Sequence, residues 1–478
     1  MPRYLIGIDN GSQSSKVTIF DEHGVVASEG RVALRPNHTP RPGVVEHPDD
    51  DIWDSIAAAC RIAMDGFAGD PSEIVGVGLC TIRFCRALLR EDGSLAQPVL
   101  SWMDERVARA YEPDRPGHRD VRWVTTTSGY VTHRLTGVFR DTAANHQGVW
   151  PIDTDTWAWS TDDRAYAETG MDRSMLFELV MPGDVLGTVT GAAAAATGLP
   201  AGLPVVATAN DKAVEALGCG LVDPASVLVS LGTYIAGMSV GTTNRSEPTA
   251  FWTNFASEPG EYLYESGGIR RGMWTVSWFR DLLGTAAADA AAAAGTRIEE
   301  LLNVEAAEVP AGSDGLLTVL DWLAPAEASF RKGSILGFDG RQGRAHVYRS
   351  ILEGIAMTMA DRTRAMADEL GVRYGRVVVS GGGSSSDLMM QIMADAFEMP
   401  AIRVVGDSAA GRGAAICAAV GTGVFPSFAD AVAAMVVERD RHQPRPEHAD
   451  VYRALGAVHR DVREHTDAIY RRTAAITG

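Results

Sequence analysis

Residues 4–21 read YLIGIDNGSQSSKVTIFD, and this stretch predicts how the N-terminal part of the chain folds. Apolar runs at 4–8 and 17–20 predict two strands, joined by a loop that is rich in Ser and Gly. Residues 21–24 form a turn, and a third apolar run begins at 25–27. We therefore predict a β-meander, followed by a helix over 49–64 and a buried strand over 74–79.

A second strand–turn–strand pattern lies near the middle of the chain. Residues 227–239 read VLVSLGTYIAGMS, which is two apolar runs around a Gly–Thr turn. At 478 residues the chain is too long for one ordinary core. We therefore predict an α/β protein with domains at 1–220 and 221–478, and allow for the last helices packing back on the first domain.

The composition is typical of a globular protein, with 46% apolar residues, 22% charged residues and a formal net charge of −18. Such a chain lacks the clustered Lys and Arg that bind phosphate backbones, so nucleic acid is not an expected partner. It has no run of 18 apolar residues and no apolar leader, so we expect no membrane partner and a cytoplasmic location. The five cysteines lack CxxC spacing and are expected to be reduced, mostly buried thiols.

The first hairpin loop has the residues of a phosphate site. Gly11 lets the backbone come close to a phosphate, Ser12 and Ser14 offer hydroxyl donors, and Lys16 offers a positive charge. Asp9, at the end of the first strand, could hold hydrated Mg²⁺. The alternative is a polar hairpin in which this Asp only caps the turn.

A further carboxylate follows a strand just before the domain boundary. The segment 207–220, ATANDKAVEALGCG, places Asp211 between a strand at 205–208 and a helix of small residues. An Asp at a helix start is often only an N-cap. The functional alternative is a ligand-facing carboxylate, because α/β sheets bind their ligands at the carboxyl ends of strands.

A glycine cluster, GGGSSS at 381–386, follows a strand at 377–379 and opens a helix. Backbone N–H groups at such a strand-to-helix turn favour a phosphate or nucleotide, although a lone glycine triplet can be only a tight turn.

The order of these motifs resembles the FGGY family of carbohydrate kinases, from residue 7 to about residue 425. The matching stretches, in chain order, are GIDNGSQSSKVTIFD (7–21), VVEHPDDDIWD (44–54), SWMDERV (101–107), YVTHRLTG (130–137), GLPAGLPVVATANDKAVEALGCGL (198–221), VLVSLGTY (227–234), and SGGGSSSDLMMQIMADAF (380–397) with GRGAAICAAVGTG (411–423). Seven elements in the family's order make the resemblance specific.

The resemblance implies two actin/hexokinase-like (ribonuclease H-like) domains with a central cleft that binds ATP and Mg²⁺. By position, Asp211 corresponds to the general base of the family and Asp9 to the Asp near magnesium. The positions that correspond to ATP contacts are Gly11, Ser12, Gln13, Ser14, Lys16, Gly232, Thr233, Gly272, Ser277, Gly382, Gly383 and Ser386. Lys16 stands where glycerol kinase has arginine, an exchange that keeps the charge but not the bidentate geometry.

The acceptor side departs from the family pattern. Arg83 and Phe84 stand where glycerol kinase has Arg–Glu and xylulokinase has Met–His, and a phenyl ring cannot hydrogen-bond a sugar hydroxyl. Lys212 follows the base directly, where it would depress the pKa of the base or point at the substrate. The remaining residues at substrate-facing positions are Trp102, Asp104 and Tyr130, with core packing as the alternative for the two aromatic residues.

Only residues 107–129 separate Arg106 from Tyr130, where family members usually carry a longer helical insert that could form a lid or an oligomer contact. A homodimer is compatible with the sequence. We expect ATP-dependent phosphorylation of a hydroxyl of a small sugar, in the first place a ketopentose as in xylulokinase, or of a polyol.

Three alternatives remain open at this point. One is a sugar-acid kinase that uses Arg83 and Lys212 to bind the carboxylate of its substrate. The others, a non-catalytic actin-like ATPase and a sugar-binding regulator, belong to different classes of protein. No helix-turn-helix pattern precedes the first strand, which counts against the regulator.

Overall fold

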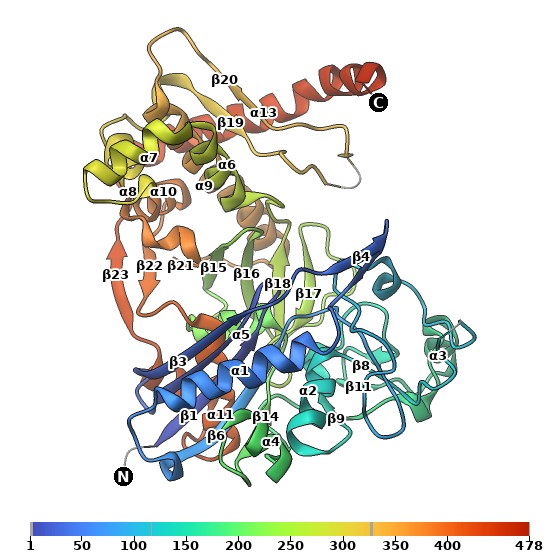
Figure 1. Cartoon of the computed structure of the whole chain (residues 1–478). Helices are drawn as coiled ribbons and strands as arrows, with labels where there is room; N and C mark the ends of the chain where they lie inside the picture. The colour runs from blue at the N-terminus through green and yellow to red at the C-terminus, as the bar shows by residue number, and fades with distance from the viewer. Residues whose placement is uncertain (1–2, 116, 326–327, 478) are drawn as a thin grey trace.

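The computed structural model describes residues 3–115, 117–325 and 328–477. Two β-sheets form its centre, one built from the first half of the chain and one from the second (Figure 1). The helices between residues 272 and 397, together with the C-terminal helix, lie on the side of the second sheet that is away from the first sheet. This arrangement is the mixed α/β architecture that the sequence predicts.

The first sheet has six strands in the order β13–β14–β6–β1–β2–β3. Their bounds are β1 Tyr4–Asn10, β2 Ser14–Asp21, β3 Val26–Ala33, β6 Ile74–Thr81, β13 Val185–Thr188 and β14 Pro204–Ala207. β1, β2 and β3 pair antiparallel in sequence, which confirms the predicted meander, whereas β1, β6 and β14 run parallel. The carboxyl ends of these parallel strands therefore meet at one edge, where Asp9 and Asp211 lie.

Helices cover both faces of the first sheet. α1 (Asp51–Asp65) shares a core with Ile6 and Ile8 of β1, while α11 (Ala409–Gly421) packs on the opposite face beside Leu5. The approach of α11 is very close: a Cβ on Gly7 would lie 1.8 Å from the carbonyl oxygen of Gly411. Glycine at this position of β1 is therefore required by packing between helix and sheet.

The second sheet has seven strands in the order β17–β18–β16–β15–β21–β22–β23. Their bounds are β15 Ser226–Leu231, β16 Ile235–Gly241, β17 Phe251–Phe255, β18 Tyr262–Ser266, β21 Arg376–Ser380, β22 Ala401–Val404 and β23 Glu438–His442. β15 and β16 form an antiparallel hairpin and β15 pairs parallel to β21, which repeats the arrangement of β1, β2 and β6.

The long helix α9 (Arg344–Leu370) packs on β16, and α10 (Asp387–Phe397) packs on β21, β22 and α9. α13 (Pro446–Thr477) lies along α9 and α10, at the top of Figure 1. The helices that cross to the first sheet are α11 and α12 (Phe428–Met435), not the last helix, because α13 finds its apolar partners on the second domain. The boundary expected near residue 220 falls in the segment between β14 and β15.

The other helices and strands are short; α5 lies between the two sheets, and the rest lie around them. They are β4 His38–Arg41, β5 Val44–Glu46, β7 Ala87–Leu89, β8 Trp123–Thr125, α2 Thr127–Thr136, β9 Arg140–Thr142, β10 Ile152–Asp153, β11 Ala158–Trp159, α3 Asp163–Thr169, β12 Glu178–Val180, α4 Gly191–Thr197, α5 Asp211–Gly218, α6 Gly272–Leu282, α7 Gly284–Ala293, α8 Ile298–Ala307, β19 Leu317–Val319 and β20 Ser334–Leu336. None of the described helices is both long enough and apolar enough to span a membrane. All five cysteines are free and buried, as predicted.

Candidate active site

Asp211 is the first residue of α5, which lies between the two sheets. Asn210 caps this helix: its side-chain oxygen accepts hydrogen bonds from the backbone N–H groups of Lys212 and Ala213, each at 3.1 Å. The N-cap role therefore belongs to Asn210, and the carboxylate of Asp211 is not used for it. Its Oδ1 is buried and has no hydrogen-bond partner among the described residues. A carboxylate oxygen left free in this way can accept a hydrogen bond from a ligand.

The pKa of Asp211 lies above its ordinary value, and burial is the largest cause. Arg83 and Lys212 pull the pKa back down, while Glu265 and Glu215 raise it further. A carboxylate balanced in this way is a better proton acceptor than an exposed Asp, because a base works best when its pKa is close to the working pH.

Arg83 follows β6 and reaches across to the second domain. Its two terminal nitrogens donate to the carboxylate of Glu265 in β18, at 2.9 and 3.0 Å. Its Nε lies 3.6 Å from Oδ1 of Asp211, and its guanidinium carbon lies 4.8 Å from the centre of the Trp252 ring. The structure thus brings together Arg83 and Asp211, as expected, and adds Glu265 and Trp252.

Phe84 adopts a left-handed backbone conformation, with φ of 65°. A bulky residue with positive φ is strained, and such strain is often retained at functional sites. The tight turn directs Phe84 onto Trp252, with ring centroids 6.0 Å apart, beside the backbone of Gly148. Phe84 therefore forms an apolar wall next to Arg83.

Lys212 pairs with a carboxylate on its own helix. Its Nζ donates to Glu215 at 2.8 Å and to the Ser230 hydroxyl at 3.2 Å. Glu215 also accepts hydrogen bonds from the hydroxyls of Ser230 and Ser380, at the ends of β15 and β21. As expected, the charge of Lys212 lowers the pKa of Asp211, although its ammonium group is paired with Glu215. The expected joint site of Lys212 and Arg83 is not formed among the described residues, because each cation pairs with a different glutamate.

Asp9 lies on β1 next to this acidic group. Its pKa is raised to about 7 by burial and by the charges of Asp211 and Glu215, while Lys16 and Lys212 lower it. A divalent cation would relieve this repulsion, so the carboxylates fit the expected Mg²⁺ held partly by water. No group of three or more His, Cys, Asp or Glu side chains that could together hold a metal ion occurs within the described residues.

The two hairpin loops present polar residues on the surface of the protein. Ser12 and Gln13 in the first loop and Thr233 in the second are exposed, whereas Gly11, Ser14 and Gly232 are half-buried. Gly11 donates its N–H to the Ser14 carbonyl oxygen at 3.1 Å, which closes the first turn. Lys16 pairs with Glu29 of β3 at 2.7 Å, so its charge is already shared within the first sheet.

α6 begins directly against the second hairpin. The N–H groups of Gly272 and Met273 donate to the carbonyl oxygens of Thr233 and Gly232, at 2.8 and 3.2 Å. A Cβ at Gly272 would collide with Ile235, so this glycine has a packing role. Ser277 lies one and a half turns further along the same helix.

The glycine-rich segment forms a short 3₁₀ turn before α10. Gly381 has φ of 80°, and Gly383 packs so closely that a Cβ would lie 2.9 Å from Leu231. Gly382 has open space around its Cα. Ser386 caps α10 and donates to the Asn303 side chain at 2.9 Å, at the edge of a cavity of about 900 Å³ between α8, α10 and α13.

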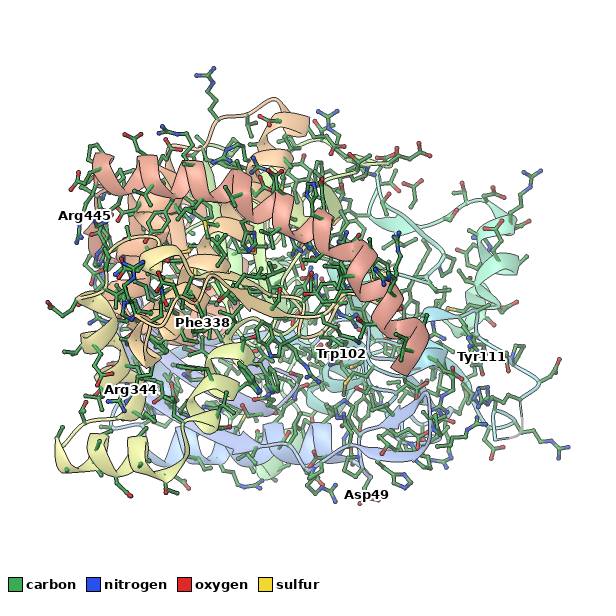
Figure 2. All side chains as sticks on the ribbon, turned by 90° about the horizontal axis from the view of Figure 1, so that it is seen from above. Asp49, Trp102, Tyr111, Phe338, Arg344 and Arg445 are labelled. Atoms are coloured by element: carbon green, nitrogen blue, oxygen red, sulfur yellow. The ribbon has the colours of Figure 1, made fainter. Side chains whose placement is uncertain are left out.

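Tyr130, Asp104 and Trp102, which were also expected to face the sugar, lie in different surroundings. The Tyr130 hydroxyl is bonded to Asp50 and Arg134 within the first core, which favours the packing alternative. Asp104 accepts hydrogen bonds from Val45 and Arg106 and has a fully buried side chain, so its oxygens are already used. Trp102, in contrast, is 47% exposed, and in Figure 2 it lies nearer the middle of the molecule than Tyr111.

Several residues of the site were missed at the sequence level. Only the tertiary fold brings three further groups near Asp211: the carboxylates of Glu265 and Glu215 and the ring of Trp252. The amides of Gln147 and Asn254 are buried, and none of their polar atoms has a hydrogen-bond partner among the described residues. Gln147 directly precedes Gly148, where an added Cβ would lie 3.6 Å from the Phe84 ring, and Asn254 is two residues from Trp252 in β17. No motif marks them, because their neighbours are distant in sequence.

Comparison with known proteins places this geometry in a family. The N-terminal domain of the FGGY family of carbohydrate kinases matches residues 4–115 and 112–218, and the C-terminal domain matches residues 227–422. The chain therefore belongs to the FGGY family of carbohydrate kinases, and it is a phosphotransferase that acts on a small sugar. This excludes the non-catalytic ATPase and regulator alternatives.

Individual relatives agree over almost the whole chain. An uncharacterised sugar kinase of Escherichia coli K12 is 48% identical over 472 residues, which cover 98% of this chain and 95% of the relative. A xylulose kinase of Bacillus subtilis is 24% identical, with 97% of each chain covered. The crystal structure of a xylulose kinase from Rhodospirillum rubrum aligns with a TM-score of 0.84 and 25% identity, over 98% of this chain and all of that one.

Proposed function

We propose that this protein transfers the γ-phosphoryl group of ATP to a hydroxyl of a small, neutral sugar or polyol, with Asp211 as the general base. The observation that carries the proposal is the free Oδ1 of Asp211, held at the start of α5 while Asn210 caps the helix. Xylulose kinases among the relatives make a ketopentose the first candidate acceptor.

In the proposed reaction, Asp211 orients the acceptor hydroxyl and takes its proton. The hydroxyl oxygen attacks the γ-phosphorus, and the bond from that phosphorus to the oxygen bridging to the β-phosphate breaks, so that ADP leaves with the electron pair. The Ser12–Gln13 loop and Thr233 come from opposite domains, and their N–H and hydroxyl groups suit the two sides of a triphosphate. Mg²⁺ near Asp9 would supply positive charge to the phosphate oxygens.

The charges at the site favour a neutral acceptor over a sugar acid. Arg83 is already paired with Glu265, and Lys212 is already paired with Glu215. With Asp9 and Asp211 added, the group has more carboxylates than cations. A substrate carboxylate would therefore meet net repulsion, because neither cation is free to pair with it.

The unpartnered amides suggest how the acceptor is recognised. Gln147 comes from the first domain and directly precedes Gly148, whereas Asn254 comes from the second domain and follows Trp252 by two residues in β17. An amide offers both donor and acceptor atoms, which matches vicinal hydroxyl groups, and leaving it unpaired in the buried state is costly. We propose that these two amides bind acceptor hydroxyls remote from the one that reacts.

A sugar panel with an Asp211 variant tests this function. ADP release is measured for ketoses, alditols and aldonates with the native protein, with Asp211→Asn, and with Asp289→Asn as an exposed control on α7. We expect turnover that depends strictly on a neutral sugar and falls about 10²–10⁴-fold in Asp211→Asn. Full sugar-dependent turnover in Asp211→Asn, or a preference for aldonates, would contradict the proposal.

A further inference from the structure

The ion pair between Arg83 and Glu265 joins the two domains directly over the candidate base. Glu265 lies on β18 with a side chain that is 1% exposed, and it takes both terminal nitrogens of the guanidinium. Bidentate pairing of this kind is strong and fixes the plane of the guanidinium. The ring of Trp252, opposite Glu265 in the β17–β18 ladder, supports one face of the same group.

Two carboxylates therefore compete for one arginine. The Nε of Arg83 is 3.6 Å from Oδ1 of Asp211, which is close enough for attraction but too long for a hydrogen bond. Oδ1 of Asp211 consequently stays unbonded, while Glu265 holds the donors that could otherwise close on it. A buried arginine that lost its partner would pair with the nearest remaining carboxylate, because an uncompensated buried charge is very costly.

From this geometry we propose that Glu265 is a positioning residue that keeps Arg83 from forming a hydrogen-bonded pair with Asp211, so that the base remains free for the acceptor hydroxyl. The inference rests on the proposed role of Asp211 as the base. The Arg83–Glu265 pair thus does more than join the two domains. It keeps the positive charge of Arg83 near the carboxylate of Asp211 without a hydrogen bond between them.

Several charged groups act on Asp211, and the proposal concerns one of them. Lys212 and Glu215 lie on α5, and Asp9 lies on β1. Arg83 follows β6, and Glu265 lies on β18. Of these, Lys212 and Glu215 form their own pair at 2.8 Å, and Asp9 lies on the Mg²⁺ side. Glu265 is thus the group whose loss would change the hydrogen bonding of Arg83.

The test is a double-mutant cycle of Glu265→Gln and Arg83→Met, followed by sugar-dependent ADP release across a range of pH. Glu265→Gln alone should lower kcat at least about tenfold, because the base becomes bonded to Arg83. The acidic limb of its kcat profile should move to lower pH, because Glu265 no longer raises the pKa of Asp211 and Arg83 lowers it more strongly. In the Arg83→Met background the same substitution should have almost no effect on kcat.

Two controls separate positioning from stability. Glu353→Gln removes a different buried carboxylate, which is bonded to Arg349 at 2.7 Å in the second domain. It should lower thermal stability without moving the acidic limb. Glu265→Asp keeps the charge and should retain more kcat than Glu265→Gln.

Additive losses in the cycle, or an unchanged acidic limb in folded Glu265→Gln, would overturn the inference. An Asp211→Asn protein with full activity would instead overturn the proposed function beneath it. The two failures are therefore distinguishable in one set of assays.

Discussion

The proposed phosphate side and the proposed acceptor side of the site are built in different ways. On the phosphate side, short exposed loops such as Ser12–Gln13 and Thr233 sit on paired strands, and their useful groups are mainly backbone N–H and hydroxyl groups. On the acceptor side, long buried side chains from both domains pair with one another around Asp211. Backbone-based sites tolerate sequence change, whereas a charge network depends on every member. The acceptor side is therefore where we expect this chain to differ from its relatives.

Replacing Asp9 should have the largest effect on the phosphate side. Asp9→Asn should slow turnover of every acceptor alike and should remove the stabilisation by Mg²⁺ in thermal unfolding. Without metal, the pKa of Asp9 in the folded protein is about 7, which is above its ordinary value. Ionised Asp9 therefore destabilises the folded state, and this loss of stability grows as pH rises from about 4 to above 7. The variant should thus be more stable than the native protein at pH 8, by on the order of a few kcal/mol, with the difference vanishing near pH 4.

A Mg²⁺ stabilisation that survives in Asp9→Asn would place the ion elsewhere. An effect of the variant on the order of sugar preference would show that the two sides of the site are not separate.

Gln147 provides the corresponding change on the acceptor side. Gln147→Ala should lower kcat/KM for the preferred sugar by about tenfold or more, the cost of one lost buried hydrogen bond, and should reorder the sugar panel. The KM for ATP should not change, because Gln147 precedes Gly148, whose backbone lies beside Phe84, and is not part of either hairpin loop. Asn254→Ala is the matched variant from the second domain. Equal losses for all sugars in both variants would count against recognition by these amides.

Tyr130→Phe tests whether this side chain only packs. The variant loses the hydroxyl that joins Asp50 and Arg134, so unfolding should cost about 1 kcal/mol less, as measured by denaturant titration. Sugar preference should stay the same. A changed sugar preference with unchanged stability would indicate that Tyr130 contacts the acceptor.

Trp102→Ala should have the smallest effect on stability, within about 0.5 kcal/mol, because the ring is half-exposed. If Trp102 contacts the acceptor, the KM for sugar should rise while the KM for ATP stays constant. An unchanged KM for both sugar and ATP would show that Trp102 does not contact the acceptor.

Much of the fold could be predicted from local pattern. The first hairpin, β6, α1 and the second hairpin follow from apolar periodicity and from turn residues that are near one another in sequence. The packing of α11 on the first sheet was not predicted, because it depends on Gly7 meeting Gly411 across most of the chain. In the site, Asp211 and Arg83 were predicted from motifs, but the buried states of Tyr130 and Asp104 depend on Asp50, Val45 and Arg106, which no motif links to them.

The amino-acid sequence by itself determined the family and the two-sheet plan, and it singled out Asp211 as the candidate base. These depend on short segments whose residues meet through the regular geometry of strands, turns and helix starts. Only the tertiary structure decided which partner each charge takes: Arg83 with Glu265, Lys212 with Glu215, and Asn210 as the cap in place of Asp211. The physical reason is that a buried charge pairs with whichever opposite group the fold brings within a few ångströms, and sequence separation does not reveal that distance.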